Sequence, residues 1–167
     1  MPRISGAVTT GGEPPRQTGR VAVPDDLGRF AAAQDAGGTY QQAIAELRQG
    51  RKSSHWMWFV FPQLAGLGSS PTAQRYAIRS LAEAQAYLAD PVLGPRLIEC
   101  AKIACAVPDR TAEEIFGPID AMKLRSSATL FWRADPARQV FRQLLDRFFG
   151  GAADPATLRL LGQDADA

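Results

Sequence analysis

Residues 51–63 read RKSSHWMWFVFPQ, and we expect the rest of the chain to pack around this stretch. It holds the only histidine of the protein, His55, and two of its three tryptophans. Lys52 and Ser54 place an ammonium group and a hydroxyl directly before the apolar run. So much aromatic surface beside hydrogen-bonding groups is typical of a wall where a hydrophobic core meets a pocket.

The secondary structure of this stretch has two alternatives. Trp56 and Phe59 have helical spacing, whereas Trp58 and Val60 alternate as they would in a strand. We favour one or two helical turns, because the flanking sequence is helical and no partner strand is evident.

Two helices are predicted before this stretch. The first begins at Pro24 with a pair of acids, which suit the positive end of the helix dipole, and ends at two glycines. The second begins at Thr39, which forms a capping-box pattern with Gln42, and ends at Gly50.

Four helix starts are predicted after the stretch from one repeated pattern, a short polar residue followed by proline. The polar side chain accepts a hydrogen bond from the first turn, and proline suits the first helical position. The pattern occurs at Ser70-Pro71, Asp90-Pro91, Asp135-Pro136 and Asp154-Pro155. Two further capping-box patterns are Ser80 with Glu83 and Thr111 with Glu114.

These signals define a series of short helices. They predict helices over residues 71–78, 81–89, 91–106, 112–116, 118–134, 136–149 and 155–161. Several of the segments are amphipathic, as helices on the surface of a globular core are. The predicted fold class is all-α, a single compact domain of about seven to nine short helices over residues 24–162.

Residues 1–23 differ from the rest of the chain in composition. They contain several prolines, four glycines and no hydrophobic periodicity, so we expect a disordered leader.

The chain has 167 residues, 46% hydrophobic content and a net charge of +2, and the leader carries that excess charge. Without clustered basic residues in the body, nucleic acid is not an expected partner.

The cysteines and the single histidine limit metal and redox chemistry. Cys100 and Cys105 lie about 140° apart around one predicted helix, so they cannot face each other in a disulfide. With one histidine and no CxxC pair, the ligands for a tetrahedral zinc site are too few, and we expect no metal and no cofactor.

No apolar segment approaches the roughly 18 residues of a membrane span. A cytoplasmic location is expected, and the oligomeric state stays open.

The predicted helix over residues 118–134 is the second place where a site is expected. Its apolar side chains are spread around nearly the whole circumference, which is typical of a helix buried on most sides. Asp120, Lys123 and Ser127 nevertheless share one line along it, at i, i+3 and i+7. Charges on a buried helix are tolerated when they pair with each other or with a ligand.

Three blocks of the sequence carry a family resemblance. They read HWMWFVFPQLAGLG (residues 55–68), YAIRSLAEAQAYLADPVLGPRLIEC (76–100) and IFGPIDAMKLRSSATLF (115–131). Over roughly residues 27–150 the chain resembles the family known as domain of unknown function 1810. The resemblance implies a mainly α-helical single domain and no established activity. A looser likeness, in architecture alone, links the chain to proteins that process NAD and ADP-ribose.

The resemblance also implies which residues of this chain occupy the motif positions of the family. They are Lys52, Ser54, His55, Trp56, Trp58, Phe59, Pro62 and Gln63 in and before the first block, Tyr76, Leu93, Gly94, Arg96 and Leu97 in the second, and Phe116, Gly117, Asp120, Lys123, Ser126, Ser127, Thr129 and Phe131 in the third.

The leading functional hypothesis is a cleft between residues 52–58 and the predicted helix 118–134. Such a cleft suits a small anionic, nucleotide-like ligand of the ADP-ribose or NAD type, and its chemistry would be hydrolytic. His55 and Asp120 are the expected catalytic residues, because they can transfer protons. The expected ligand-binding residues are Lys52, Ser54, Trp56, Trp58, Gln63, Arg96, Lys123, Ser126 and Ser127.

A competing hypothesis gives the same residues structural roles. His55 then hydrogen-bonds to backbone, the tryptophans belong to the core, and the serines cap helices. Asp120 and Lys123 form an ordinary i,i+3 ion pair, and Arg96 pairs with Glu99 on the surface. In this case the protein is a non-catalytic interaction module with a protein partner.

Overall fold

The structure, a computed structural model, describes residues 24–162, and the predicted leader lies outside the described residues. Within residues 24–162 the chain forms ten α-helices and one short 3-10 helix. They are α1 (Pro24–Asp35), η1 (Ala36–Gly38), α2 (Thr39–Gln49), α3 (Met57–Val60), α4 (Pro71–Arg75), α5 (Leu81–Ala89), α6 (Leu93–Ala106), α7 (Ala112–Phe116), α8 (Pro118–Ala134), α9 (Gln139–Phe149) and α10 (Pro155–Leu160). The prediction of an all-α fold is confirmed.

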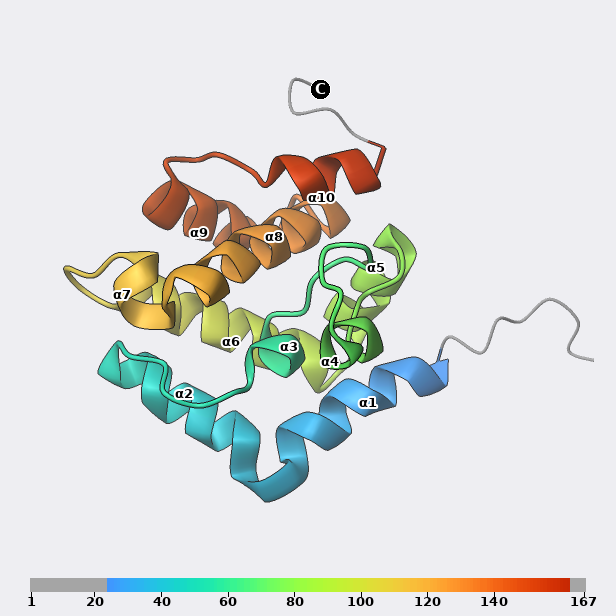
Figure 1. The fold of residues 1–167 in the computed structure, drawn as a ribbon, viewed down its shortest axis with the longest axis horizontal. Helices are drawn as coiled ribbons and strands as arrows, with labels where there is room; N and C mark the ends of the chain where they lie inside the picture. The colour runs from blue at the N-terminus through green and yellow to red at the C-terminus, as the bar shows by residue number, and fades with distance from the viewer. Residues whose placement is uncertain (1–23, 163–167) are drawn as a thin grey trace, which may run out of the picture.

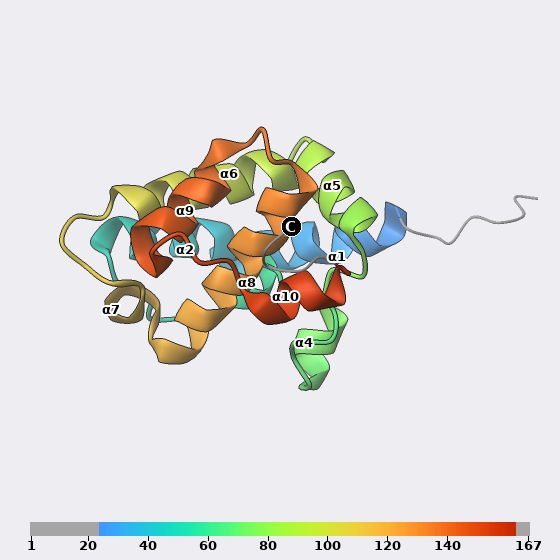
Figure 2. The ribbon, with the colours of Figure 1, turned by 90° about the horizontal axis from the view of Figure 1, so that it is seen from above.

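Helix α8, 17 residues long, passes through the middle of the fold (Figure 1). It packs against α5, α7, α9 and α10, while α6 packs against α2, α5 and α9. Helices α1 and α2 form a V along one edge (Figure 1), and α4 lies on the opposite side of the molecule from α6 (Figure 2). None of the helices in the described part of the chain is long and apolar enough to cross a membrane.

A chain of aromatic rings passes through the core from α1 to α9. In the order Phe30, Tyr87, Phe131 and Phe141, neighbouring ring centroids lie 5.2, 5.3 and 5.6 Å apart. All four side chains are buried. Because each ring buries a large apolar area, this chain ties α1, α5, α8 and α9 into one core.

A second aromatic cluster lies under residues 51–63. The Trp56 ring packs against Phe61 and Phe116, with centroids 6.4 Å from each, and all three side chains are buried. The stretch contains one helical turn, α3, as predicted. Its aromatic content therefore divides, with Trp56 in the core and Trp58 half-buried at the surface.

The segment after α4 departs from the prediction. Ile78 pairs with Leu64 in an isolated parallel bridge, in which the Ile78 N–H donates to the Gln63 carbonyl at 2.8 Å. The Ala65 N–H donates to the Ile78 carbonyl at 2.7 Å. The predicted helix over residues 71–78 is therefore too long, because the backbone of the fully buried Ile78 pairs with another segment.

Two of the four polar-proline patterns start helices where predicted. Ser70 and Asp154 each accept a hydrogen bond from the first turn of α4 and α10. Asp90 and Asp135 instead accept hydrogen bonds within short turns. Helices α6 and α9 consequently begin two and three residues later than predicted.

The predicted capping boxes also have mixed outcomes. Thr111 and Glu114 form the complete box. Ser80 caps α5 with its hydroxyl, whereas the partner acid of the predicted box pairs with Arg29 instead. The predicted box at Thr39 is wrong, because the N-cap of α2 is Gly38 in a left-handed conformation that favours glycine.

Cys100 and Cys105 are free thiols, as their spacing on one helix predicts. Burial is the main cause that raises the pKa of Cys100 to about 12 and that of Cys105 to about 11. Both thiols therefore stay protonated at neutral pH and are poor nucleophiles.

Candidate functional site

The buried carboxylate of Glu46, on α2, fixes the backbone that follows this helix. Its Oε1 accepts hydrogen bonds from the backbone N–H groups of Ser53 (2.5 Å) and Ser54 (2.8 Å) and from Trp56 Nε1 (3.1 Å). Its Oε2 accepts from the Ser54 hydroxyl (2.5 Å) and the Gln42 amide (2.9 Å). Because Glu46 is only 2% exposed, these five donors replace its hydration and hold the segment in one conformation.

The same hydrogen bonds set the ionisation of Glu46. Burial alone would raise its pKa, but donors from the Ser54 hydroxyl, the Ser53 backbone and the Gln42 amide outweigh burial and lower the pKa to about 2. Glu46 is therefore charged at neutral pH. Its role is to position the segment, since both of its oxygens are occupied by protein donors.

Lys52 joins this segment to α8. Its Nζ lies 2.8 Å from Asp120 Oδ2, donates to the Ser54 carbonyl at 2.6 Å and lies 5.1 Å from the Trp56 ring centroid. The Lys52 side chain is 7% exposed. A buried ammonium group needs such partners, so Lys52 anchors Asp120 and is not a free cation.

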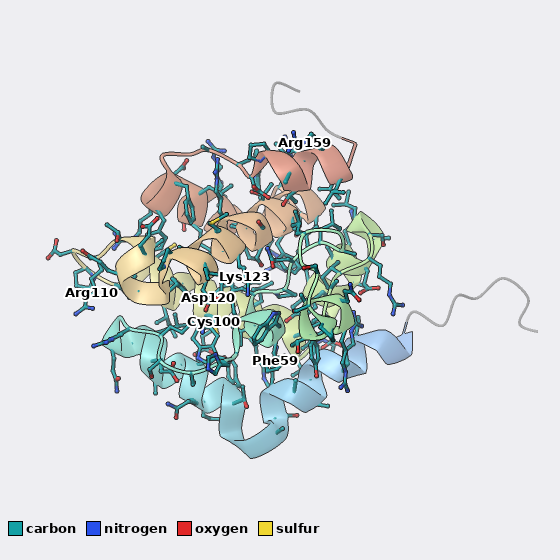
Figure 3. The ribbon with its side chains drawn as sticks, in the orientation of Figure 1. Phe59, Cys100, Arg110, Asp120, Lys123 and Arg159 are labelled. Atoms are coloured by element: carbon teal, nitrogen blue, oxygen red, sulfur yellow. The ribbon has the colours of Figure 1, made fainter. Side chains whose placement is uncertain are left out.

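Lys123 approaches the same carboxylate from the more exposed side. Its Nζ lies 3.6 Å from Asp120 Oδ1 and 4.8 Å from the Trp58 ring centroid, and its side chain is 23% exposed. Figure 3 shows Asp120 and Lys123 beside each other at the middle of the molecule. Asp120 therefore holds two ammonium groups, one with each oxygen.

A groove of about 360 Å³, which we call the histidine groove, opens beside these charges. His55 is exposed there, and among the described residues its imidazole has no hydrogen-bond or ion-pair partner. The groove is lined by Lys52, His55, Met57, Trp58, Phe116, Gly117, Pro118, Ile119, Asp120 and Lys123.

The start of α8 borders the histidine groove. Gly117 precedes the helix with φ 83°, a conformation that favours glycine, and Pro118 occupies the first helical position. The N–H groups of the first turn carry partial positive charge in a long helix. Together with Lys123, they make this end of the groove favourable for an anion.

A second groove, of about 430 Å³, adjoins the first, and we call it the serine groove. Ile119 and Met122 stand at its surface with 70% and 72% exposure. The groove is lined by Trp58, Gln63, Leu67, Gly68, Ser69, Ser70, Ala73, Ile119, Met122, Lys123, Ser126, Asp154 and Ala156. Because Trp58, Ile119 and Lys123 line both grooves, the two spaces meet at these three side chains.

Several of the predicted site residues come together in space. Five of them line the histidine groove, namely Lys52, His55, Trp58, Asp120 and Lys123. Gln63 and Ser126 line the serine groove. Ser126 is also tied to the protein, because its hydroxyl lies within hydrogen-bond distance of the Met122 carbonyl (3.2 Å) and of Asp154 Oδ2 (3.0 Å).

The other predicted site residues lie away from the two grooves. Ser54 and Trp56 bind Glu46 behind the wall of the histidine groove. Ser127 is buried, and its hydroxyl has no partner in the described residues. Arg96, on α6, pairs with Asp35 at 2.9 Å and takes no part in the lining of either groove.

Glu46 is the main residue of this region that was not predicted from the sequence. A signal for it exists, because it follows Ala43 by three residues and so shares the apolar face of α2. A carboxylate in that position indicates a buried charge in need of donors. Ile119 and Met122 had no such signal, since apolar residues on an apolar helix do not reveal which of them are exposed.

Within residues 24–162, histidine, cysteine and acidic side chains form no group of three or more that could hold a metal ion. The charged and titratable side chains that line the histidine groove are those of Lys52, His55, Asp120 and Lys123. They can hold an anion through the Lys123 ammonium group and move a proton through the imidazole.

The family model described as "Protein of unknown function (DUF1810)" matches residues 24–161. This chain belongs to that family. The resemblance of the three motif blocks is thereby confirmed. The chain is also similar to the conserved hypothetical protein Rv1873 from Mycobacterium tuberculosis, with 56% identity and a TM-score of 0.80. That similarity covers 83% of this chain and 98% of the crystal structure of Rv1873. A comparison with curated proteins gives no match.

The DUF1810 motif positions have two different surroundings in this chain. His55, Trp58, Asp120 and Lys123 line the histidine groove, whereas Trp56 and Phe131 belong to the core. The motif blocks therefore contain both groove-lining residues and the residues that support them.

Proposed function

We propose that the histidine groove and the serine groove together bind a small ligand with an anionic group next to a planar group, as in nucleotides and ADP-ribose. The junction of the grooves at Lys123, Trp58 and Ile119 carries this proposal. The anionic group lies beside Lys123 and the start of α8. The planar group packs along Ile119 and Met122, which are otherwise exposed to water.

Lys123 is the cation that meets the ligand, and Lys52 is its support. The distance from Asp120 to Lys52 is 2.8 Å, whereas the distance to Lys123 is 3.6 Å. Asp120 is thus neutralised first by the buried Lys52, which leaves donors of Lys123 directed at the groove. An ammonium group of this kind binds phosphate as a point charge.

The exposure of His55 in the histidine groove supports a proton-transfer role for it in a hydrolysis. The exposed imidazole accepts a proton from water while the water oxygen forms a bond to the electrophilic centre beside the anionic group. The bond to the leaving group breaks, and that group takes the electron pair and accepts the proton from the His55 imidazolium, which restores the neutral imidazole. Asp120 is a positioning residue in this proposal, because both of its oxygens are held by lysines.

Binding is tested first, by thermal unfolding with ADP-ribose, NAD, nucleotides and sugar phosphates. A ligand at a hundred times its Kd stabilises the folded state by about 2.7 kcal/mol, which corresponds to a rise of several degrees in Tm. K123Q should remove most of this rise. The matched control is K102Q, because Lys102 is exposed on α6 and lies outside both grooves. A flat response of the wild type to every compound contradicts the proposal.

Hydrolysis is tested separately with any compound that binds. H55N should bind it with similar affinity and lower kcat by about 100-fold or more. Unchanged turnover in H55N would remove the proton-transfer role and leave a binding protein.

A second candidate function is protein binding, and the exposure of Ile119 and Met122 favours it. Exposed apolar side chains beside a groove are typical of interaction surfaces. In that case I119S/M122S should lose a protein partner that K123Q retains, and the small-molecule screen should be flat.

A further inference from the structure

A third cavity lies near the other end of α8, between α8, α9 and the start of α10. Its volume is about 350 Å³, and its charged lining consists of Arg125, Arg133 and Arg142. Trp132 and the loop residues 151–153 complete most of the wall. We call it the arginine pocket. It shares no lining residue with the histidine or serine groove.

Arg125 is held in place by the loop that follows α9. Its Nε donates to the Ala152 carbonyl and its Nη2 to the Ala153 carbonyl, both at 2.9 Å. These two contacts fix the plane of the guanidinium group and leave its remaining N–H groups for another acceptor. Neutral carbonyls position Arg125 but do not cancel its charge.

The guanidinium groups of the other two arginines contact the same aromatic ring, that of Trp132. The Arg133 and Arg142 guanidinium carbons lie 4.4 and 5.0 Å from the Trp132 ring centroid. Such contacts attract cations without neutralising them. The buried Nε of Arg133 has no hydrogen-bond partner in the described part of the chain.

The carboxylates near the pocket do not balance its charge. Among the described residues, Asp146 is the one acid within ion-pair distance of these three arginines, and it contacts Arg142 at 3.3 Å. Two of the three positive charges therefore have no counterion within residues 24–162. Like charges that share a pocket repel one another. A divalent anion would neutralise the two positive charges that have no counterion.

The loop is shaped to come close to these arginines. Gly151 has φ 79°, and a Cβ atom at this position would lie 3.0 Å from Asp146 Oδ1 and 3.2 Å from Arg142 Nη2. A side chain there would be strained and would push against the arginine. Glycine thus allows the loop to cover the pocket without displacing Arg142.

We infer that the arginine pocket binds a phosphate group in its dianionic form, either as free phosphate or as the phosphate of a small monoester. Planar guanidinium groups match the oxygens of phosphate with paired N–H donors, and the charge of a phosphate dianion equals the uncompensated charge of the pocket. The Arg133 Nε–H gains an acceptor, and Arg125 and Arg142 supply further donors. This site goes beyond the proposed function and does not depend on it.

The test compares inorganic phosphate with chloride at equal ionic strength and about pH 8, where phosphate is dianionic. Phosphate should raise the Tm of the folded wild type in a saturable manner and shift the NMR resonances of the Arg133 Nε–H and the Trp132 indole N–H. R133Q and R142Q should each weaken phosphate binding about tenfold or more. The matched control R159Q changes an exposed arginine on α10 (Figure 3) and should bind as the wild type does.

Further variants separate this site from the proposed ligand grooves. K123Q should keep the full phosphate response if the arginine pocket is the site, and lose it if the response arises at the histidine groove. R142Q changes a partly exposed side chain, so it remains informative should R133Q fail to fold. If ribose 5-phosphate binds more tightly than inorganic phosphate, the preferred ligand of the pocket is a phosphate monoester. Equal effects of phosphate and chloride, or an unchanged response in R142Q, would overturn the inference.

Discussion

The charged side chains near the two ends of α8 differ in how many internal partners they have. Near its start, Asp120 meets two ammonium groups, and the neighbouring Glu46 meets five hydrogen-bond donors. Near its end, three arginines line one pocket, and among the described residues only Arg142 has a carboxylate partner, Asp146. A charge with close, buried partners, such as Lys52 or Glu46, supports the architecture. A charge with a longer, more exposed contact, such as Lys123, or with no counterion can instead be completed by a ligand. Substitutions that remove one partner from each kind of charge test this division.

Removal of the Glu46 carboxylate should cause the largest loss of stability. E46A leaves the partly buried N–H groups of Ser53 and Ser54 and the buried Trp56 indole without their acceptor. The free energy of unfolding should fall by about 3 kcal/mol or more, measured by urea denaturation. The control E114A removes an exposed capping-box acid and should cost about 1 kcal/mol. Equal effects of the two substitutions would show that the Glu46 network is not the anchor of this segment.

The pKa of Glu46 predicts a specific dependence of stability on pH. The pKa is about 2 in the folded protein and lies below its ordinary value of 4.5. The unfolded chain therefore binds this proton at higher pH than the folded one. Stabilisation by Glu46 is complete above about pH 4.5 and is lost as the pH falls toward 2.

The comparison of E46Q with the wild type isolates this contribution. E46Q should be less stable at neutral pH, and the difference between the two proteins should shrink between pH 4.5 and 2. Urea denaturation at several pH values measures the difference. A constant difference over this range would mean that Glu46 does not titrate with a lowered pKa.

Separation of Lys52 from Asp120 should have an intermediate effect. K52M leaves Asp120 with the longer contact to Lys123 alone, and D120N leaves the buried Lys52 without a carboxylate. Each change should lower the free energy of unfolding by about 2 kcal/mol, and a double-mutant cycle should show coupling of about 1 kcal/mol or more. The corresponding cycle for Lys123 and Asp120 should show weaker coupling, because that pair is longer and more exposed. Stronger coupling to Lys123 would reverse the roles assigned to the two lysines.

The helical fold could be predicted because its signals are local in the sequence. Polar residues before proline, capping boxes and terminal glycines specify helix ends through contacts within one turn. The errors at Asp90, Asp135 and Ile78 arose where these local contacts formed a turn or where the backbone paired with a distant segment. Such competition depends on tertiary packing, which spacing alone does not reveal.

The candidate site was predictable in part for the same reason. His55 and Lys52 are near each other in sequence, and Asp120 and Lys123 lie on one helix face, so two halves of the histidine groove could be recognised separately. That Lys52 reaches Asp120 could not be read from either half. The arginine pocket brings together α8, α9 and the start of α10, and nothing in the local pattern of Arg133 or Arg142 indicates their common Trp132.

The smallest effect on stability is expected from R142Q, in the absence of phosphate. This substitution removes an exposed i,i+4 ion pair with Asp146, which costs a few tenths of a kcal/mol, but it also relieves repulsion from the other two arginines. The net change in unfolding free energy should lie within about 0.5 kcal/mol of zero. The matched control R138Q breaks a similar exposed pair, with Asp135, away from the pocket and should be slightly destabilising. Added chloride should stabilise the wild type more than R142Q, because salt screens the repulsion that the substitution removes. If R142Q instead lost as much stability as K52M, its charge would be internally compensated, and the contrast between the two ends of α8 would not hold.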